Sequence, residues 1–146
     1  MGVAVNLLDA VAAKLNETTF GSATVERALI PKAVRKELGQ LIQVCLQGKT
    51  SIEQDRTGDW IEYRVGVGLS YPLSSVADQE DGLNMAEDIQ DWMLQTANRR
   101  ITTVDGEFCL VPPFEMDNVF NPDQANEAGV MFCITNFNYR FYKDRT

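Results

Sequence analysis

A strict alternation of residue types from Trp60 to Leu73 constrains the fold more than any other feature of this sequence. The odd-numbered positions are all apolar: Ile61, Tyr63, Val65, Val67, Leu69, Tyr71 and Leu73. A period of two over this length predicts a long β-strand with one face on a hydrophobic core. The other face carries Gly66 and Gly68, so we expect it to be flat and bare, open to water or to another backbone.

The segments around this strand predict an α+β fold. Apolar residues at helical spacing predict two main helices, over residues 3–16 and about 79–98. Further strands are predicted at residues 24–30, 40–47, 107–112 and 130–142, with a short helix at 32–38 and a loop at 117–129. We therefore expect a single domain over residues 1–146, with two main helices packed on a largely antiparallel sheet that contains a long β-hairpin.

The tip of that hairpin is the candidate interaction surface. The polar segment from Gly48 to Asp59 is longer than chain closure needs, which predicts a mobile arm, Lys49–Asp59, that orders against a partner. Trp60 begins the long strand on its solvent side, and it is either covered by the hairpin tip or contacts another chain. The candidate interaction residues are Asp55, Arg56, Trp60, Glu62 and Arg64.

The charge of the chain disfavours tight binding to nucleic acid. Thirteen basic residues stand against 21 acidic ones, a formal net charge of −8, and the basic residues are spread along the sequence. Electrostatic attraction to phosphates requires clustered cations. An acidic surface is compatible with DNA that passes without being held, so we expect no measurable binding to double-stranded DNA at physiological salt.

No catalytic, cofactor-binding or metal-binding pattern emerges from the sequence. The chain has no histidine, which removes the commonest general base and metal ligand. The Gly48-Lys49-Thr50-Ser51 motif lacks the earlier glycine of a phosphate-binding loop, because that position is Gln43. The acidic residues around the start of the second helix complement the helix dipole and form a solvated face. We therefore expect a protein that is not an enzyme.

The three cysteines, Cys45, Cys109 and Cys133, are far apart and each lies among apolar neighbours. This pattern predicts reduced, buried thiols that react slowly in the folded protein. The N-terminal segment has no basic region and carries Asp9 and Lys14 within its apolar stretch. We therefore expect neither a signal peptide nor a membrane span.

Taken in order, the segments resemble the tail terminator family of long-tailed bacteriophages, the tail completion or head–tail joining proteins. The resemblance covers almost the whole chain and does not extend to residues 105–125. It rests on LLDAVAAKL at 7–15, VERALIP at 25–31, LIQVCLQG at 41–48, QDRTGDWIEYRVGVGL at 54–69, MAEDIQDWML at 85–94 and MFCITNFNYRFY at 131–142.

The resemblance implies a structural subunit of a ring of six copies. Such a ring caps the tail tube, stops its polymerisation and joins the tail to the head connector, so it implies the tube protein and a connector or neck protein as partners. Assembly takes place in the bacterial cytoplasm, and the finished location is the tail–head junction of the virion, with no membrane contact and DNA passing through.

Three alternatives stay open at this stage. Head-completion and neck subunits are also small ring proteins, and fold analogy separates them poorly from tail terminators. The second alternative is a prophage remnant or a contractile-injection component with the same ring role. The third is an enzymatic or small-molecule-binding α+β domain that uses Asp88, Asp91 and Cys109; a monomer with a deep polar pocket would favour it.

Overall fold

The structure is a computed structural model that describes residues 2–27, 39–117 and 129–144, without the side chains of 112–117. The elements follow the chain in this order: α1 (Val3–Leu15), β1 (Thr24–Arg27), β2 (Leu41–Gln54), β3 (Gly58–Pro72), α2 (Val76–Leu94), the 3-10 turn η2 (Thr96–Asn98), β4 (Arg100–Thr103), β5 (Gly106–Asp117) and β6 (Val130–Asp144). The short helix predicted at 32–38 and most of the loop predicted at 117–129 lie outside the described residues.

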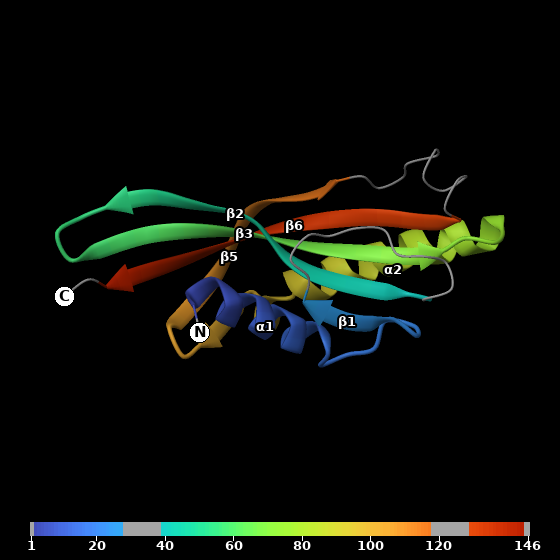
Figure 1. The fold of residues 1–146 in the computed structure, drawn as a ribbon, viewed down its shortest axis with the longest axis horizontal. Helices are drawn as coiled ribbons and strands as arrows, with labels where there is room; N and C mark the ends of the chain where they lie inside the picture. Colours follow the sequence, from blue (N-terminus) through green and yellow to red (C-terminus); the bar gives the residue numbers. More distant parts are fainter. Residues whose placement is uncertain (1, 28–38, 118–128, 145–146) are drawn as a thin grey trace.

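Six strands form one curled sheet in the order β1-β2-β3-β6-β5-β4 (Figure 1). β1 runs parallel to β2, and the other neighbouring pairs are antiparallel. The prediction of an α+β fold with a largely antiparallel sheet is therefore confirmed. β3 lies between β2 and β6 and pairs with both, with β2 from Asp59 to Ser70 and with β6 from Gly58 to Pro72.

The hydrophobic core lies between the sheet and both helices. The odd-numbered side chains of β3 from Ile61 to Tyr71 are buried, as the alternation predicts. Leu7, Leu8, Val11 and Leu15 of α1 belong to the same apolar cluster, and so do Met85, Ile89 and Met93 of α2. Because the helices share one core with one face of β3, both cover that face of the sheet.

The opposite face of β3 is not bare, which corrects the expectation for Gly66 and Gly68. A β-carbon at Gly68 would lie 3.1 Å from the ring of Phe132, and one at Gly66 would lie 2.8 Å from the Gln47 side chain. The two glycines therefore make room for side chains that lean in from β6 and β2. The sequence shows the missing β-carbons but not which neighbours fill the space.

The segment from Gly48 to Asp59 is not an extended loop. β2 continues to Gln54 and β3 begins at Gly58, so only Asp55–Thr57 lies between the two strands. The side chains from Lys49 to Thr57 are exposed, and a strand with two solvated faces shows no apolar alternation that a sequence pattern can detect. Two β-bulges, between Leu46 and Gly48 and between Ser51 and Glu53, further break the period.

A second correction concerns the region after α2. The helix was expected to run to about residue 98, but it ends at Leu94 and η2 follows. The unpredicted strand β4 then pairs with β5. The Asn98 side chain donates a hydrogen bond to the Trp92 carbonyl at 2.7 Å, which satisfies a carbonyl at the helix end. Helix, turn and hairpin therefore follow one another without a loop between them.

Candidate functional site

All five candidate interaction residues lie on one end of the sheet, which we call the distal arm. It consists of Gly48–Arg64 and Asn138–Asp144, that is, the paired outer parts of β2, β3 and β6 with the turn between β2 and β3. The end of this arm extends past the N-terminus of α1 (Figure 1). The helices therefore do not cover the end of the arm. Its inner face is nevertheless buried at Ile61, Tyr63, Tyr139 and Phe141, where the ring of Phe108 from β5 contacts those of Tyr63 and Phe141.

On the outer face of the arm, β3 and β6 make two cross-strand contacts. The ring centroids of Trp60 and Tyr142 are 5.3 Å apart with a tilt of 58°, and Trp60 remains 43% exposed. Next to them, Glu62 Oε2 and Arg140 Nε are 3.6 Å apart. Arg64 follows on the same face and is exposed. Trp60 is thus packed on Tyr142 and not covered by the hairpin tip.

Sequence reasoning did not select Tyr142 as part of this site. The sequence does contain a pattern that places Tyr142: β6 alternates as β3 does, so Phe141 and Tyr142 lie on opposite faces of the strand. The pairing partner could not be read from the pattern, because Trp60 and Tyr142 are 82 positions apart in the sequence. Only that register brings Tyr142 beside Trp60.

Asp55 fixes the turn at the end of the arm. Its Oδ1 atom accepts hydrogen bonds from the backbone N–H of Thr57 and of Gly58, both at 2.8 Å, and from the Thr57 hydroxyl at 2.9 Å. The Thr57 and Tyr142 hydroxyls are also 2.8 Å apart. The hydrogen bonds that Asp55 accepts, first those from the Thr57 and Gly58 N–H groups, lower the pKa of its carboxyl.

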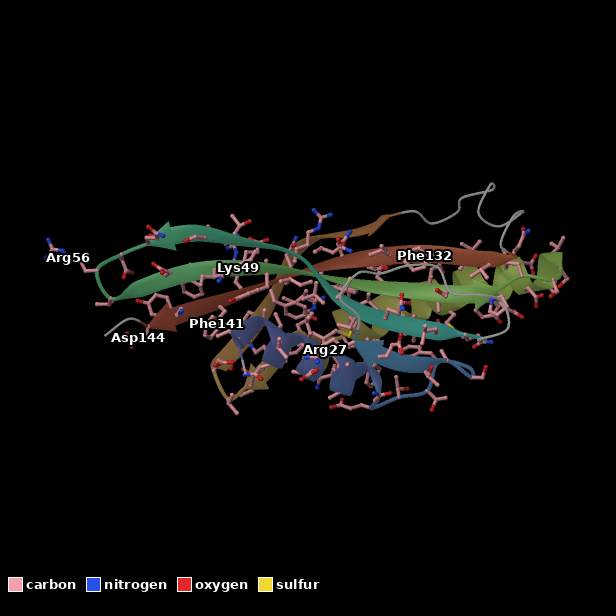
Figure 2. All side chains as sticks on the ribbon, viewed as in Figure 1. Arg27, Lys49, Arg56, Phe132, Phe141 and Asp144 are labelled. Carbon is pink, nitrogen blue, oxygen red and sulfur yellow. The ribbon has the colours of Figure 1, made fainter. Side chains whose placement is uncertain are left out.

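The turn presents Arg56 to solvent. Figure 2 shows its side chain directed away from the end of the arm. A β-carbon at Gly58 would collide with the Lys143 carbonyl and the Tyr142 ring. Only glycine therefore lets β6 approach the turn so closely. The arm ends in a bonded turn with a single cationic side chain at its apex, and the prediction of a long tip loop is wrong.

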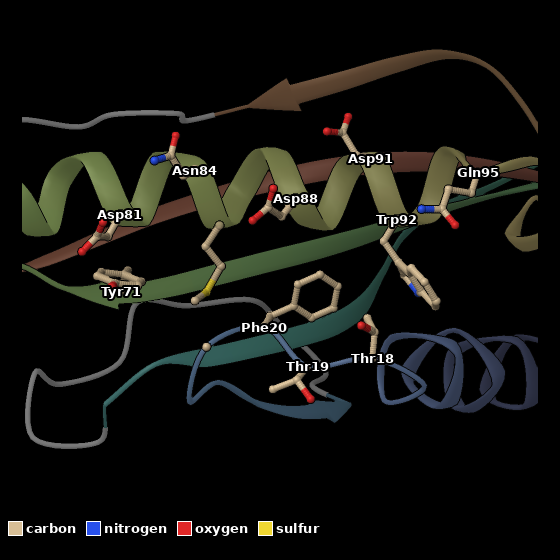
Figure 3. Close-up of a pocket in the computed structure, with 12 residues that line it drawn as sticks. Thr18, Thr19, Phe20, Tyr71, Asp81, Asn84, Asp88, Asp91, Trp92 and Gln95 are labelled. Atoms are coloured by element: carbon tan, nitrogen blue, oxygen red, sulfur yellow. The ribbon is translucent and has the colours of Figure 1, made fainter.

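A groove of about 430 Å³ lies between α2 and residues 18–21 (Figure 3). Asp81, Asp88 and Asp91 line it from α2, and Phe20 and Trp92 contribute aromatic surface. The indole N–H of Trp92 donates to the Lys14 carbonyl at 3.0 Å, which ties α2 to the end of α1. The groove is acidic and open, with its aromatic surface anchored to the core.

The structure does not bring together Asp88, Asp91 and Cys109, the residues of the enzymatic alternative. Asp88 and Asp91 line the groove, whereas Cys109 is on β5, pairs in register with Arg140 and is not among the groove residues. Within residues 2–27, 39–117 and 129–144, no cluster of three or more Cys, Asp or Glu side chains has a metal-binding arrangement. The groove thus contains carboxylates without the proposed nucleophile.

The cysteines are free thiols, and two of them fit the prediction of burial. Cys45 and Cys133 are buried, and burial raises the pKa of both, that of Cys133 to about 11. Cys109 is only half-buried, which corrects the expectation for this residue. Its neighbours Phe108 and Leu110 face the core, so the strand alternation turns Cys109 to the opposite face.

Burial also raises the pKa of Cys109, and its proximity to Glu107 acts in the same direction: the sulfur is 3.6 Å from Glu107 Oε1.

In the part of the chain that the structure describes, no helix has the length and apolar character that a membrane crossing requires.

Comparison with solved structures finds a similar fold in a chain of the virion of a native gene transfer agent (GTA) particle. The two chains superpose with a TM-score of 0.56, and the match covers 98% of each chain at 16% sequence identity. This likeness shows that the two chains share a fold over nearly their whole length. No protein-family model and no curated protein matches the sequence.

Proposed function

We propose that this protein is a structural subunit of a phage-like virion and not an enzyme. The observation that carries the proposal is the shared fold with a chain of a gene transfer agent virion over 98% of both chains. The order of the sequence segments supports the same class, because it resembles the tail terminator family. Its work is then done by interfaces with other virion proteins.

More specifically, we propose a ring, six copies in number, at the junction of tail and head. The ring caps the tail tube, stops its polymerisation and binds the head connector or neck protein on its other side. The distal arm supports an assembly role, since exposed aromatic and charged side chains such as Trp60 and Arg56 stand on a scaffold held by β-sheet pairing.

The acidic groove is the specific observation that favours a different function, a small-molecule-binding domain. Its volume of about 430 Å³ lies within the usual range for ligand pockets. Such pockets are mostly apolar with few polar groups, however, and this one is lined by three aspartates without a nucleophile–base pair. The structural role is therefore the better supported proposal.

Native mass spectrometry of the purified protein, together with electron microscopy of particles that contain it, tests the ring. A closed ring of six is the expected result. A protein that stays monomeric at assembly concentrations and within particles would overturn the proposal. If a monomer also binds a small ligand through the groove, and Asp88→Asn removes that binding, the small-molecule function takes its place.

DNA passage without retention is part of the same proposal. With 21 acidic and 13 basic residues, the chain carries a net negative charge, which repels phosphates at long range. A gel-shift titration with double-stranded DNA should show no binding at physiological salt. Micromolar binding that weakens steeply with added salt would reveal a basic patch and contradict a passive channel.

A further inference from the structure

Two strand edges of the distal arm have no strand beside them within the described residues. β1 pairs with β2 only from Leu41 to Val44, which leaves one edge of Gly48–Gln54 without a neighbour. β5 pairs with β6 no further than Arg140, which leaves the opposite side of the arm open along Phe141–Lys143. A strand edge of this kind presents backbone N–H and C=O groups that can bind another strand.

The two edges are on opposite sides of β3 and their strands run in the same direction. β2 and β6 are each antiparallel to β3, so both run toward the end of the arm, as Figure 1 shows. Rotating a copy of the chain about an axis along the arm brings β6 of one copy beside β2 of the next. The two strands are then parallel, and because the two edges differ, the contact repeats from copy to copy.

We propose that the distal arms of neighbouring copies join into one continuous sheet, with Phe141–Lys143 of β6 pairing in parallel with Gly48–Gln54 of β2 in the next copy. This inference rests on the ring proposed above and names the contact that closes it. The channel wall then consists of three strands from each copy. Closed pairing of this kind removes every free edge of the arm.

The local chemistry of the two edges fits this occupant. Neither segment contains a proline, so every backbone N–H that points away from β3 is available for pairing. The bulges in β2 bend the strand, and barrel walls require such curvature. Ile52 at the second bulge is 43% exposed, and a neighbouring strand would cover apolar surface there.

Chemical cross-linking between Ser51 and Lys143 of neighbouring copies tests the contact. Both residues are exposed. Ser51 pairs with Ile61 and Lys143 pairs with Asp59, so both side chains lie on the same face of the sheet. The variant carries Ser51→Cys and Lys143→Cys in a Cys109→Ser background and is treated with a short bis-maleimide. A ladder of covalent oligomers up to the ring size is the expected result. The matched control, Ser51→Cys alone, should give no covalent dimer, since β2 does not meet β2.

Hydrogen exchange supplies a second readout that needs no substitution. On ring formation, the exchange of edge amides in Gly48–Gln54 and Phe141–Lys143 should slow by up to about tenfold. The outer amides of β1 should keep their exchange rate. If a ring forms without this protection and without the ladder, or if the single cysteine variant gives dimers, the strand pairing is wrong and the ring proposal stands. If no ring forms at all, the proposed function fails, and the strand pairing fails with it.

Discussion

The same three strands, β2, β3 and β6, form both the helix-covered part of the sheet and the distal arm, yet the two regions are held in different ways. In the covered part, side chains such as Leu69 and Val67 are buried against α1 and α2. On the arm only the inner face is buried, at residues such as Tyr63 and Phe141. On its outer face and at its end, Trp60 and Ile52 stay exposed, and cross-strand pairs with the Asp55 turn maintain the order. Backbone pairing extends the sheet past the helices, but the extension leaves edges and apolar groups that suit a partner.

Two truncations on β3 should separate the regions most strongly. Leu69→Ala removes a fully buried side chain and should lower the free energy of unfolding by about 2–5 kcal/mol. Trp60→Ala loses mainly the ring contact with Tyr142 and should cost about 0.5–1.5 kcal/mol, while it weakens ring assembly. Urea denaturation and native mass spectrometry measure the two effects. Equal losses of stability would mean that the outer face of the arm is packed like the core.

Thiol labelling should distinguish the regions by rate and by pH. Cys133 and Cys45 are buried with raised pKa values, so a maleimide should modify them only after unfolding. Cys109 is half-buried and should react first, still more slowly than a free thiol because its pKa is also raised. Because the thiolate is the reactive form, the labelling rate of Cys109 should rise as the pH increases from about 7 to 9. Peptide mass spectrometry gives the order, and early modification of Cys133 would contradict the burial.

Two glycine substitutions test how tightly the end of the arm is built. Gly58→Ala forces a β-carbon into the Lys143 carbonyl and the Tyr142 ring and should destabilise the protein by about 1–3 kcal/mol. Gly48→Ala is the matched control, because its β-carbon would lie 3.9 Å from that of Arg64, an ordinary contact, and should be neutral or slightly stabilising. Denaturation midpoints measure both. A harmless Gly58→Ala would show that β6 does not close on the turn.

The smallest effect concerns protonation of Asp55. Its pKa is lowered in the folded state by the Thr57 and Gly58 N–H groups, so its contribution is fully present above the unfolded value of about 3.9. That contribution is lost as the pH falls through the folded pKa. Amide exchange or NMR of Thr57 and Gly58 should show the turn intact at mildly acidic pH and open only below the usual carboxyl range. Asp55→Asn should weaken the turn at neutral pH and leave α2 unchanged. Opening of the turn in the wild type near pH 5 would contradict these hydrogen bonds.

The sequence selected five candidate residues, whose role in binding stays a prediction, but it did not show how they are arranged. Asp55, Arg56, Trp60, Glu62 and Arg64 were selected because a polar segment adjoined a strongly alternating strand, and the structure places all five on one arm. Tyr142 was missed, and the expected tip loop is mostly strand. The reason is that residues paired across strands are distant in sequence and that a strand exposed on both faces has no apolar period.

The sequence by itself determined which elements exist where apolar residues recur at a fixed period, because burial of one face requires that period. The odd-numbered face of β3, the positions of α1 and most of α2, and the α+β class all follow from it. Tertiary structure alone decided what fills the space beside Gly66 and Gly68, how far β2 and β3 continue, and which side Cys109 faces. Those features depend on strand register and on contacts between distant residues, which no local pattern contains.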